Sequence, residues 1–468
     1  MSKKKPKIFD HLPIVDIAAK GQAVGKTSDG QVVFVEGAVP GDVVEVRSSR
    51  KRKGAWQGQI LQYHEYSPDR RTAQCEHFGV CGGCKWQHLE YSAQLTYKAK
   101  EVAHNLTHIG KLEDIPFEPI LAAPEEYDYR NKMEFSFSNQ RWLTNDEIAQ
   151  ADEKLEKNGL GFHKPRMWDK VVDIQKCHLQ ADPSNAIRNF IRTYALEHQL
   201  TFFNPRAKEG FLRTLMIRNT LAGEFMVLIQ FYEDLKQQRE ALLQTLQEEF
   251  PQIISLLYCI NKKANDTLYD QEIVCFSGRT YIIEKMEELN FKINAKSFFQ
   301  TNTQQALSLY QLVRDFADLK ASDLVYDLYT GTGTIALFLA RHCQKVVGIE
   351  SVPEAIEAAK DNALTNAIQN CFFEVGDMKD CFNDLFVERH GPADVIITDP
   401  PRNGMHPDVV QQLIQSTASK IVYVSCNSAT QARDLSLMKD HFNIVRSRAV
   451  DMFPQTHHVE NIVLLERK

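Results

Sequence analysis

A thiol and a carboxylate each follow an apolar, β-rich run in the last third of the chain. Cys426 comes just after the run 421–424, and Asp399-Pro-Pro-Arg402 comes directly after the run 395–398. Two consecutive prolines fix φ and remove backbone donors, so they form a rigid wall against which a planar ring can be presented to a reactant. Cys426 and Asp399 are expected to project into one crevice at the ends of these runs, and a thiol in that position indicates covalent chemistry.

A glycine-rich loop follows an earlier apolar run. The sequence Asp327-Leu-Tyr-Thr-Gly-Thr-Gly-Thr-Ile-Ala336 contains Gly331 and Gly333, which let the backbone turn tightly and approach a ligand. Glu350 stands 19 residues after Gly331, at the end of the next run, where a carboxylate can accept hydrogen bonds from both hydroxyls of a ribose. Asp377 ends the third run and can bind an adenine amine in the same way. The alternative is that these carboxylates only cap helices.

The default ligand of such a crevice is a dinucleotide, but Asp399-Pro-Pro401 favours a different one. An Asp-Pro-Pro sequence after the fourth strand is typical of methyltransferases. The crevice is therefore predicted to bind S-adenosylmethionine and to present a planar base to its methyl sulfonium.

Four cysteines form a second candidate site. Cys75, Cys81 and Cys84 lie in or just before a glycine-rich loop, with five and then two residues between them, and Cys177 stands far along the chain. Ten cysteines spread over a long cytosolic chain do not predict a disulfide framework, so clustered ones are metal or catalytic candidates. Four thiolates suit either an iron–sulfur cluster or a tetrahedral zinc ion, and the spacing does not distinguish these metals.

Parallel strands joined by helices must position the residues of the crevice. After Ala321, five short β-rich runs alternate with helical patterns, which predicts an α/β, doubly wound, Rossmann-like sheet. Segments 442–450 and 458–466 predict an added antiparallel pair. The five runs are 324–328, 345–349, 372–375, 395–398 and 421–424.

The 468 residues leave room for about three domains. Residues 1–66 alternate apolar and polar positions between glycine turns, which predicts a small antiparallel barrel. Residues 67–290 mix strands and helices, interrupted by a polar segment, 144–157, that is expected to be an exposed insertion; residues 291–468 hold the predicted crevice.

Charge is distributed unevenly along the chain. The net charge is −6, but residues 1–70 carry twelve Lys and Arg against eight Asp and Glu, so the amino-terminal part is +4 and the remainder is −10. The run Arg47-Ser-Ser-Arg-Lys-Arg-Lys53 is expected to form a basic loop near Trp56, which either contacts RNA or is simply solvated. No apolar run is long enough for a membrane span and no signal peptide is evident, so we expect a soluble, cytoplasmic protein without a membrane partner.

Taken together, these motifs resemble the bacterial RNA 5-methyluridine methyltransferases, most closely the members that modify 23S ribosomal RNA. The similarity covers nearly the whole chain. Besides the glycine loop and Asp399-Pro-Pro-Arg402, it rests on Ser297-Phe-Phe-Gln-Thr-Asn302, Ser425-Cys-Asn427 and Asp451-Met-Phe-Pro-Gln-Thr-His-His-Val-Glu460.

The resemblance implies roles for individual residues. Cys426 would be the nucleophile and Glu460 the general base, while Gln300, Tyr329, Glu350 and Asp399 would line the donor and uracil pockets. Thr334 stands in the donor loop where the ribosomal RNA members usually have Asn.

The resemblance also implies cofactors, domains and a substrate. It implies a TRAM-type, OB-like barrel at the amino terminus, a [4Fe-4S] cluster on the four cysteines of an α+β central domain, and 23S ribosomal RNA as the substrate, with a flipped uridine and no role for DNA. The transfer RNA members of the family typically lack the barrel and the cluster, which favours ribosomal RNA.

The implied chemistry needs both a thiol and a carboxylate. Carbon 5 of uracil is a poor nucleophile, so a thiolate adds to carbon 6 and creates an enolate that attacks the methyl group. A carboxylate must then remove the proton from carbon 5 before the thiolate can leave. Considered alone, Cys426 fits a buried apolar residue and Glu460 a solvated one; the shared crevice favours the catalytic roles.

Four other functions compete with this one. An exocyclic-amine methyltransferase normally has an aromatic residue after Asp-Pro-Pro, where this chain has Arg402. A radical S-adenosylmethionine enzyme requires Cys-x3-Cys-x2-Cys, which the spacing of Cys75 and Cys81 does not match. A transfer RNA uridine-5-methyltransferase remains an alternative, as does an inactive RNA-binding assembly factor, although intact Cys426 and Glu460 argue against the latter.

Overall fold

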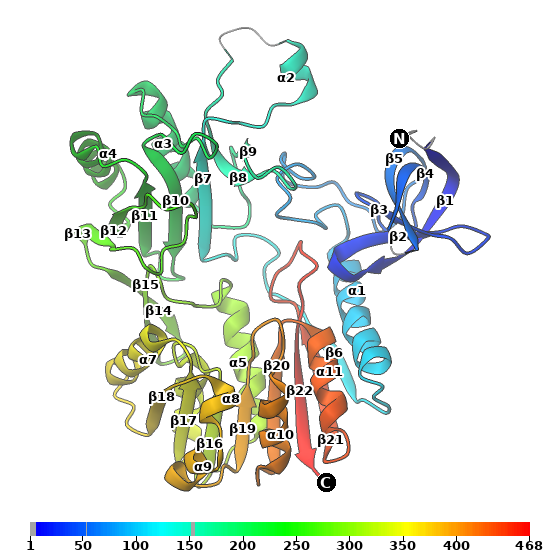
Figure 1. Ribbon diagram of the computed structural model, residues 1–468, viewed down its shortest axis with the longest axis vertical. Helices are drawn as coiled ribbons and strands as arrows, with labels where there is room; N and C mark the ends of the chain where they lie inside the picture. Colours follow the sequence, from blue (N-terminus) through cyan, green and yellow to red (C-terminus); the bar gives the residue numbers. More distant parts are fainter. Residues whose placement is uncertain (1–5, 53, 151–154) are drawn as a thin grey trace.

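The computed structural model describes residues 6–52, 54–150 and 155–468. Figure 1 shows three bodies: a small barrel in blue, a central sheet in green, and a larger sheet with its helices from yellow to red. Within the described ranges, no helix combines the length and the apolar character that crossing a membrane requires.

The amino-terminal body is a closed barrel with the strand order β1-β2-β3-β5-β4, which confirms the predicted small barrel, but the barrel is not entirely antiparallel as predicted, since β3 and β5 pair in parallel. Alternate side chains point inward, and Val33, Val35, Val44 and Val46 are at most 1% exposed. Its elements are β1 (Lys7–Ala18), η1 (Ala19–Gly21), β2 (Gln22–Lys26), β3 (Val32–Val35), β4 (Val43–Arg52) and β5 (Ala55–Glu65).

The basic run lies on a strand, so the prediction of a basic loop at 47–53 was wrong. β4 pairs with β5 as far as Arg52 opposite Ala55. Inter-strand hydrogen bonds therefore satisfy this backbone while Arg47, Arg50 and Arg52 stay exposed and hydrated. Lys53 lies outside the described residues.

The central body is a seven-stranded sheet with the order β13-β12-β11-β10-β7-β8-β9. Two helices pack their apolar residues, among them Ile187, Ile191 and Leu242, against it. The elements are β7 (Lys132–Ser138), β8 (Gly159–His163), β9 (Val171–Asp173), α3 (Ser184–Glu197), β10 (Leu212–Asn219), β11 (Phe225–Phe231), α4 (Lys236–Glu249), β12 (Ile253–Ile260) and β13 (Val274–Gly278). A hairpin of β14 (Tyr281–Met286) and β15 (Leu289–Asn294) leads to the larger sheet.

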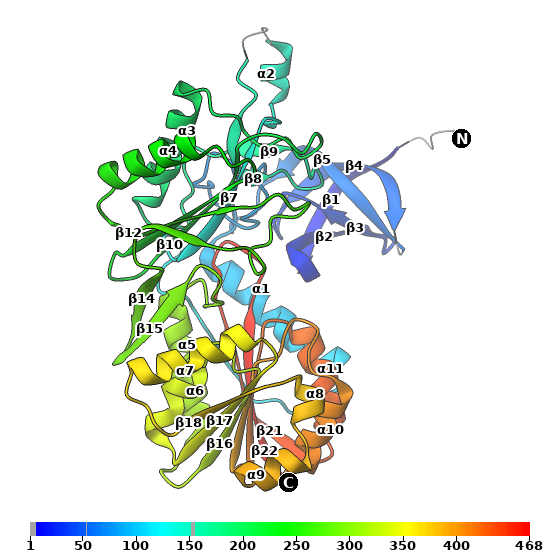
Figure 2. The same ribbon diagram turned by 60° about the vertical axis from the view of Figure 1, so that its left-hand side comes forward.

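The polar segment 144–157 forms a single short helix within its described part. Helix α2 (Asn145–Ala149) begins with a capping box, in which the Thr144 side chain accepts from the Glu147 backbone N–H and the Glu147 side chain accepts from the Thr144 backbone N–H. Helix α2 projects away from the other elements (Figure 2). Residues 151–154 of the segment lie outside the described residues.

The largest body confirms the predicted methyltransferase-type α/β fold. Its eight strands have the order β18-β17-β16-β19-β20-β22-β21-β6, and the first five are parallel. Apolar cores lie on both faces, which explains the continuous apolar runs of the sequence. The elements are α5 (Thr303–Ala317), β16 (Leu324–Leu328), α6 (Thr334–Leu339), η3 (Ala340–His342), β17 (Lys345–Glu350), α7 (Pro353–Thr365), β18 (Cys371–Val375), α8 (Met378–Cys381), α9 (Asp384–His390), β19 (Val395–Thr398), α10 (Pro407–Gln415), β20 (Lys420–Ser425), α11 (Ser428–Met438), β21 (Phe442–Val450) and β22 (Glu460–Arg467).

A segment from much earlier in the chain completes this sheet. The segment consists of α1 (Tyr91–His104), η2 (Asn105–Ile109) and β6 (Phe117–Leu121), and β6 pairs in parallel with β21. The side chains of Val102 and Leu106 are buried in one of the two apolar cores that cover the sheet. The sequence pattern placed this segment in the central domain, because an edge strand that pairs only over long range leaves no local signal.

Candidate active site

The carboxyl ends of four adjacent parallel strands meet at one edge of the large sheet. Strands β17, β16, β19 and β20 are neighbours in that order. The residues at their ends are Glu350, Tyr329, Asp399 and Cys426, respectively. The crevice of an open α/β sheet forms at this edge, so these four predicted site residues share one crevice.

The glycine loop presents an open surface to this crevice. Gly331 has φ of 56°, and a Cβ built on it would meet no atom within 4 Å. Gly333 has φ of 75°, and a Cβ there would lie only 2.9 Å from the Cβ of Ala359. Gly331 therefore faces free space, while Gly333 lets the loop pack against α7.

Tyr329 adopts an unusual backbone conformation at the start of this loop. Its φ is 65°, a left-handed conformation that costs a non-glycine residue of the order of 1–2 kcal/mol. Burial raises the pKa of its hydroxyl, and the neighbouring charges of Asp377, Asp434 and Glu350 add to the rise. Such local strain is concentrated at ligand-binding sites, which agrees with the predicted place of Tyr329 in the donor pocket.

The two predicted ribose and adenine carboxylates have different surroundings. Glu350 accepts from the backbone N–H of Gly331 at 3.2 Å and of Val352 at 3.0 Å, so the loop fixes its orientation in the crevice. Asp377 is exposed and caps α8 by accepting from the Lys379 N–H at 3.1 Å. Asp377 therefore caps a helix, which was the alternative to a ligand-binding role for this carboxylate.

Cys426 and Glu460 face each other across two strands. The antiparallel ladder of β20 and β22 ends with Ser425 paired with Asn461, the residues next to Cys426 and Glu460, and the charge of Glu460 helps to raise the pKa of the Cys426 thiol, so the two side chains lie close together. Glu460 is 6% exposed, and Cys426 is half-buried. Glu460 also pairs with Val450 on the other side, which holds its backbone between two strands.

Burial and like charge keep the acids of this crevice protonated to unusually high pH. Burial raises the pKa of Cys426 to about 11, and the charges of Glu460 and Asp399 contribute while Arg402 opposes them. Burial also raises the pKa of Glu460 to about 8, with Asp399 adding to it. Burial, with a contribution from Asp327, raises the pKa of Asp399 to about 7. Carboxyl groups that titrate near neutral pH are suited to accept and release protons.

Two residues of the crevice were not predicted as site residues from the sequence. The hydroxyl of Tyr310, on α5, lies 3.3 Å from Oγ1 of Thr334, and its pKa is raised by burial and by the charges around it, including Asp399 and Glu460. Asp327 is 1% exposed and accepts from Oγ1 of Thr330 at 2.5 Å; burial raises its pKa to about 7. Asp327 opens the glycine motif, which is a usable signal, whereas Tyr310 has the spacing of an ordinary core residue.

The Ser297–Asn302 motif lies directly before α5 and forms hydrogen bonds with segments on either side of the crevice. Asn302 caps α5 by accepting from the Gln305 N–H at 3.1 Å, and its side chain donates to the Met452 carbonyl at 3.0 Å. The backbone carbonyl of Gln300 accepts from the Asn131 side chain at 2.8 Å, while the Gln300 residue itself is half-buried. The motif thus connects the glycine-loop side of the sheet with the segment that ends at Glu460.

The loops that carry Asp399 and Cys426 are bound to each other. The carbonyl of Arg402 accepts from Nδ2 of Asn427 at 2.9 Å and from Oγ1 of Thr430 at 3.2 Å. The Asp-Pro-Pro-Arg and Ser-Cys-Asn motifs are therefore one structural unit.

The four predicted metal-binding cysteines come together from two distant segments. The thiols of Cys75 and Cys84 have pKa values raised to about 11 and about 12, first by burial and then by their neighbours Cys81 and Cys177. The loop is fixed to the segment of Cys177, because the backbone N–H of Gln175 donates to Nε2 of His77 at 3.0 Å.

A single tetrahedral zinc ion with Zn–S bonds of about 2.3 Å brings its sulfurs within about 3.8 Å of one another. Among the residues that the structure describes, no three of these cysteine sulfurs lie within 4.8 Å of one another. Four thiolates suit either a tetrahedral zinc ion or an iron–sulfur cluster.

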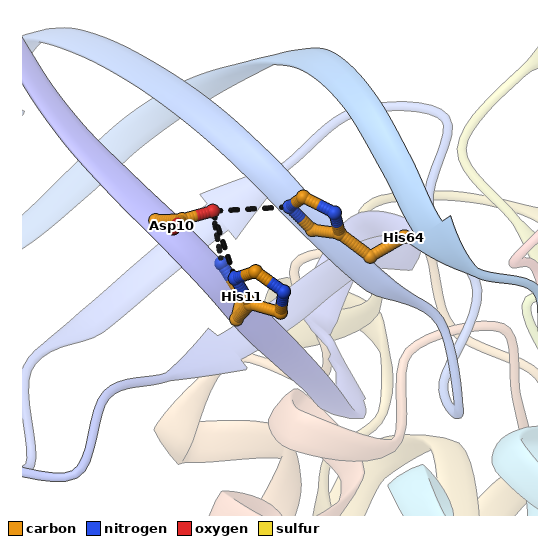
Figure 3. Close-up of side chains that lie close together, drawn as sticks. All are labelled: Asp10, His11 and His64. Carbon is orange, nitrogen blue, oxygen red and sulfur yellow. Dashed lines mark hydrogen bonds and ion pairs between the residues drawn. The ribbon is translucent and has the colours of Figure 1, made fainter.

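A group of potential ligands on the barrel does not form a comparable site. Nδ1 of His11 and Nε2 of His64 lie 2.9 Å and 3.0 Å from one carboxylate oxygen of Asp10 (Figure 3). The two rings are stacked, 3.9 Å apart with an interplanar angle of 6°. Contacts of both rings with Asp10 account for this arrangement on the surface of the barrel, so we assign the group as a polar surface contact.

Comparisons with protein families identify two matches. The family described as tRNA (uracil-5-)-methyltransferase matches residues 206–468, and the TRAM domain matches residues 14–58.

Two curated relatives cover almost the whole chain. A protein of Bacteroides thetaiotaomicron is 51% identical over 453 residues, which are 96% of this chain and 100% of that protein. A protein of Porphyromonas gingivalis is 51% identical over 463 residues, 97% of this chain and 99% of that protein. Both are named uncharacterized RNA methyltransferases.

A solved structure is similar over the same length. It is the tRNA (uracil-54, C5)-methyltransferase of Pyrococcus abyssi in complex with S-adenosyl-L-homocysteine, with 27% identity, a TM-score of 0.74, and coverage of 97% of this chain and 99% of that chain. A protein that acts on transfer RNA thus matches this chain across the barrel and the cysteine-bearing domain. The expectation that transfer RNA members typically lack the barrel does not hold for this neighbour.

Proposed function

This chain belongs to the family of RNA uracil-5-methyltransferases, and on that premise we propose that it methylates carbon 5 of a uridine in 23S ribosomal RNA through a covalent bond from Cys426. The observation that carries the proposal is the position of Cys426 opposite Glu460, next to Asp399 and the glycine loop. A nucleophile, a base and a nucleoside crevice are the parts that this reaction requires.

The donor is S-adenosylmethionine, bound along the glycine loop. Gly331 offers an open surface there, Glu350 is oriented for the ribose hydroxyls, and Tyr329 and Gln300 line the pocket. Asp377, although it caps α8, keeps a second carboxylate oxygen for the adenine amine. Thr334 lies beside Tyr310 at the floor of this pocket.

The reaction begins at Cys426. Its thiolate adds to carbon 6 of a uracil flipped out of its stack, and the resulting enolate attacks the methyl group through carbon 5. This transfer breaks the bond between the methyl carbon and the sulfonium sulfur and releases S-adenosylhomocysteine. Because burial and nearby carboxylates raise the pKa of Cys426, the free thiol is protonated at neutral pH, and its proton passes to water as the substrate binds. Glu460 then removes the proton from carbon 5, and the Cys426 sulfur leaves as the double bond re-forms.

The four cysteines are proposed to hold a [4Fe-4S] cluster. Cys75, Cys81, Cys84 and Cys177 supply four thiolates, the ligand set of such a cluster, and the cluster is the group that the family resemblance implies. Methyl transfer from S-adenosylmethionine requires no electron, so the role we assign to the cluster is to position the central domain and the RNA.

Transfer RNA is the second candidate substrate, favoured by the similarity to the Pyrococcus abyssi enzyme. The support for 23S ribosomal RNA is the closer resemblance of the sequence motifs to ribosomal RNA members. The test is to incubate the protein with labelled S-adenosylmethionine and either protein-free 23S ribosomal RNA or transfer RNA, both prepared from cells that lack the protein. We expect label in the 23S RNA, and a clear preference for transfer RNA would overturn the substrate assignment.

A further inference from the structure

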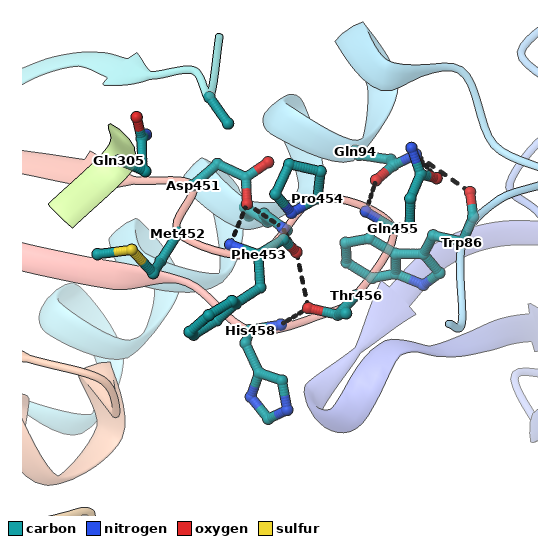
Figure 4. Close-up of polar contacts among 12 residues, drawn as sticks. Trp86, Gln94, Gln305, Asp451, Met452, Phe453, Pro454, Gln455, Thr456 and His458 are labelled. Atoms are coloured by element: carbon teal, nitrogen blue, oxygen red, sulfur yellow. Dashed lines mark hydrogen bonds and ion pairs between the residues drawn. The ribbon is translucent and has the colours of Figure 1, made fainter. Parts of the chain in front are cut away.

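The segment 451–459 is a long hairpin loop that is almost completely buried. It connects β21 to β22, and its two ends meet where Val450 pairs with Glu460. Asp451, Met452 and Gln455 are each 0% exposed. Figure 4 shows this loop among side chains from distant parts of the chain. A buried loop must find partners for its polar groups within the protein, so its shape is set by those partners.

One anchor is an ion pair at the beginning of the loop. Nζ of Lys98, on α1, donates to Oδ1 of Asp451 at 2.5 Å and to the Phe453 carbonyl at 3.1 Å. The side chains of Lys98 and Asp451 are both 0% exposed. Separating a buried ion pair leaves an uncompensated charge inside the protein, which is strongly destabilising. The pair of Lys98 and Asp451 therefore fixes the loop to α1.

The second anchor is Gln455, in the middle of the loop. Its backbone N–H donates to Oε1 of Gln94 at 3.0 Å, and Nε2 of Gln94 donates back to its side-chain oxygen at 3.0 Å. Arg71 donates to that same oxygen at 3.2 Å, and Nε2 of Gln455 donates to Glu126 at 2.9 Å.

The remaining hydrogen bonds of Gln455 reach the cysteine loop. Its carbonyl accepts from the backbone N–H groups of Lys85 at 2.8 Å and Trp86 at 3.1 Å, directly after Cys84. Gln455 has φ of 66°, an unfavourable conformation that these hydrogen bonds maintain. All polar groups of Gln455 are thus engaged, with partners from α1, from 71–86 and from Glu126.

We propose that Gln455 is a positioning residue: it fixes segment 451–459 between α1 and residues 85–86 and thereby sets where the carboxyl of Glu460 meets carbon 5 of the uracil. The inference rests on the proposed function. Cys426 directly follows β20 and the donor loop follows β16, so neither is part of the segment that Gln455 holds. Loss of Gln455 should therefore impair removal of the carbon 5 proton and leave methyl transfer and donor binding intact.

The test is Gln455→Ala, examined for the protein–RNA adduct during turnover on denaturing gels. We expect the fraction of protein in the adduct to rise at least fivefold over wild type, as in Glu460→Gln, with S-adenosylmethionine affinity within twofold of wild type. The matched control is Gln230→Ala, because Gln230 is also buried, at 5% exposed, and its side chain also forms hydrogen bonds, with Asp266 and Asn261, but it lies on β11.

The control separates positioning from general stability. Both variants should lower the melting temperature, and only Gln455→Ala should accumulate adduct. If Gln455→Ala does not fold, Gln94→Met, which removes the reciprocal hydrogen bonds, is measured in the same way. Adduct at the wild-type level in the folded variant, or equal accumulation of adduct in Gln230→Ala, would overturn this inference and leave the proposed function standing. Absence of both methylated RNA and adduct with wild-type protein and Glu460→Gln would overturn the proposed function and this inference together.

Discussion

Cys426 directly follows β20 and lies close to Glu460 at the start of β22, because the ladder between these strands pairs Ser425, the residue before Cys426, with Asn461, the residue after Glu460. The proposed nucleophile and base are therefore held by two neighbouring strands of one rigid sheet. Their separate strands allow one function to be removed without the other, which makes the two proposed steps experimentally separable.

The base can be tested without removing the nucleophile. Glu460→Gln keeps the size of the side chain but cannot accept the carbon 5 proton, so methyl transfer should occur once and the protein should remain bonded to RNA. We expect a stable protein–RNA adduct that contains the transferred methyl group, and turnover reduced by at least about 100-fold. Normal turnover of this variant would show that another group is the base.

The same substitution has a consequence for stability. Burial and Asp399 raise the pKa of Glu460 to about 8 in the folded protein, from an ordinary value of 4.5. The folded state thus binds this proton more tightly than the unfolded state, so its stabilising contribution is complete below pH 4.5 and is lost as pH rises to about 8. A Gln side chain does not titrate in this pH range, so Glu460→Gln lacks this pH-dependent contribution to stability.

The free energy of unfolding of Glu460→Gln should therefore exceed that of wild type increasingly from pH 5 to pH 8.5, by up to about 4 kcal/mol. Denaturant unfolding at these two pH values measures the difference. A difference that is independent of pH would contradict the raised pKa.

The cysteine site can be examined by its metal content. Protein purified without oxygen should be brown and contain about four iron atoms per chain. Stoichiometric zinc without visible absorbance would favour the zinc alternative. Cys177→Ala should lower the stability of the central domain and leave S-adenosylmethionine affinity unchanged, because Cys177 lies outside the strand-end crevice. Equal loss of both would contradict that separation.

The exposed basic residues of β4 in the barrel should contribute to RNA binding by neutralising phosphates. Arg50 and Arg52 are exposed on β4, so Arg50→Gln with Arg52→Gln should reduce the slope of log affinity against log salt by about 1.4, or about 0.7 for each phosphate that is no longer neutralised. The matched control is Lys236→Gln, at the exposed start of α4 in the central body. An unchanged slope in the double variant would show that this strand does not bind RNA.

Much of the crevice could be predicted from the sequence, because buried parallel strands appear as continuous apolar runs and their ends are marked by local motifs. Asp399, Cys426 and Glu350 each directly follow or end such a run. The barrel was equally evident from its alternating pattern, apart from the charged end of β4, which has the composition of a loop but pairs with β5.

Features that depend on long-range contacts could not be predicted. β6 joins the sheet through β21, more than 300 residues later, and Tyr310 is distinguished from a core residue only by the carboxylates around it. The partners of Gln455 come from segments far apart in the sequence, so no spacing could indicate them. The RNA substrate also leaves no local pattern, since a transfer RNA enzyme matches nearly the whole chain.

The proposed chemistry at carbon 5 is tested most directly with RNA whose uridines carry tritium at that carbon. Replacement of the carbon 5 hydrogen by a methyl group must release the tritium to water, so wild-type protein with S-adenosylmethionine should release one tritium for each methyl group incorporated. Cys426→Ala should release none and transfer none, whereas Cys343→Ala, a buried cysteine at 8% exposed that precedes β17, should behave as wild type. Methyl incorporation with full retention of tritium, or tritium release by Cys426→Ala, would contradict the mechanism.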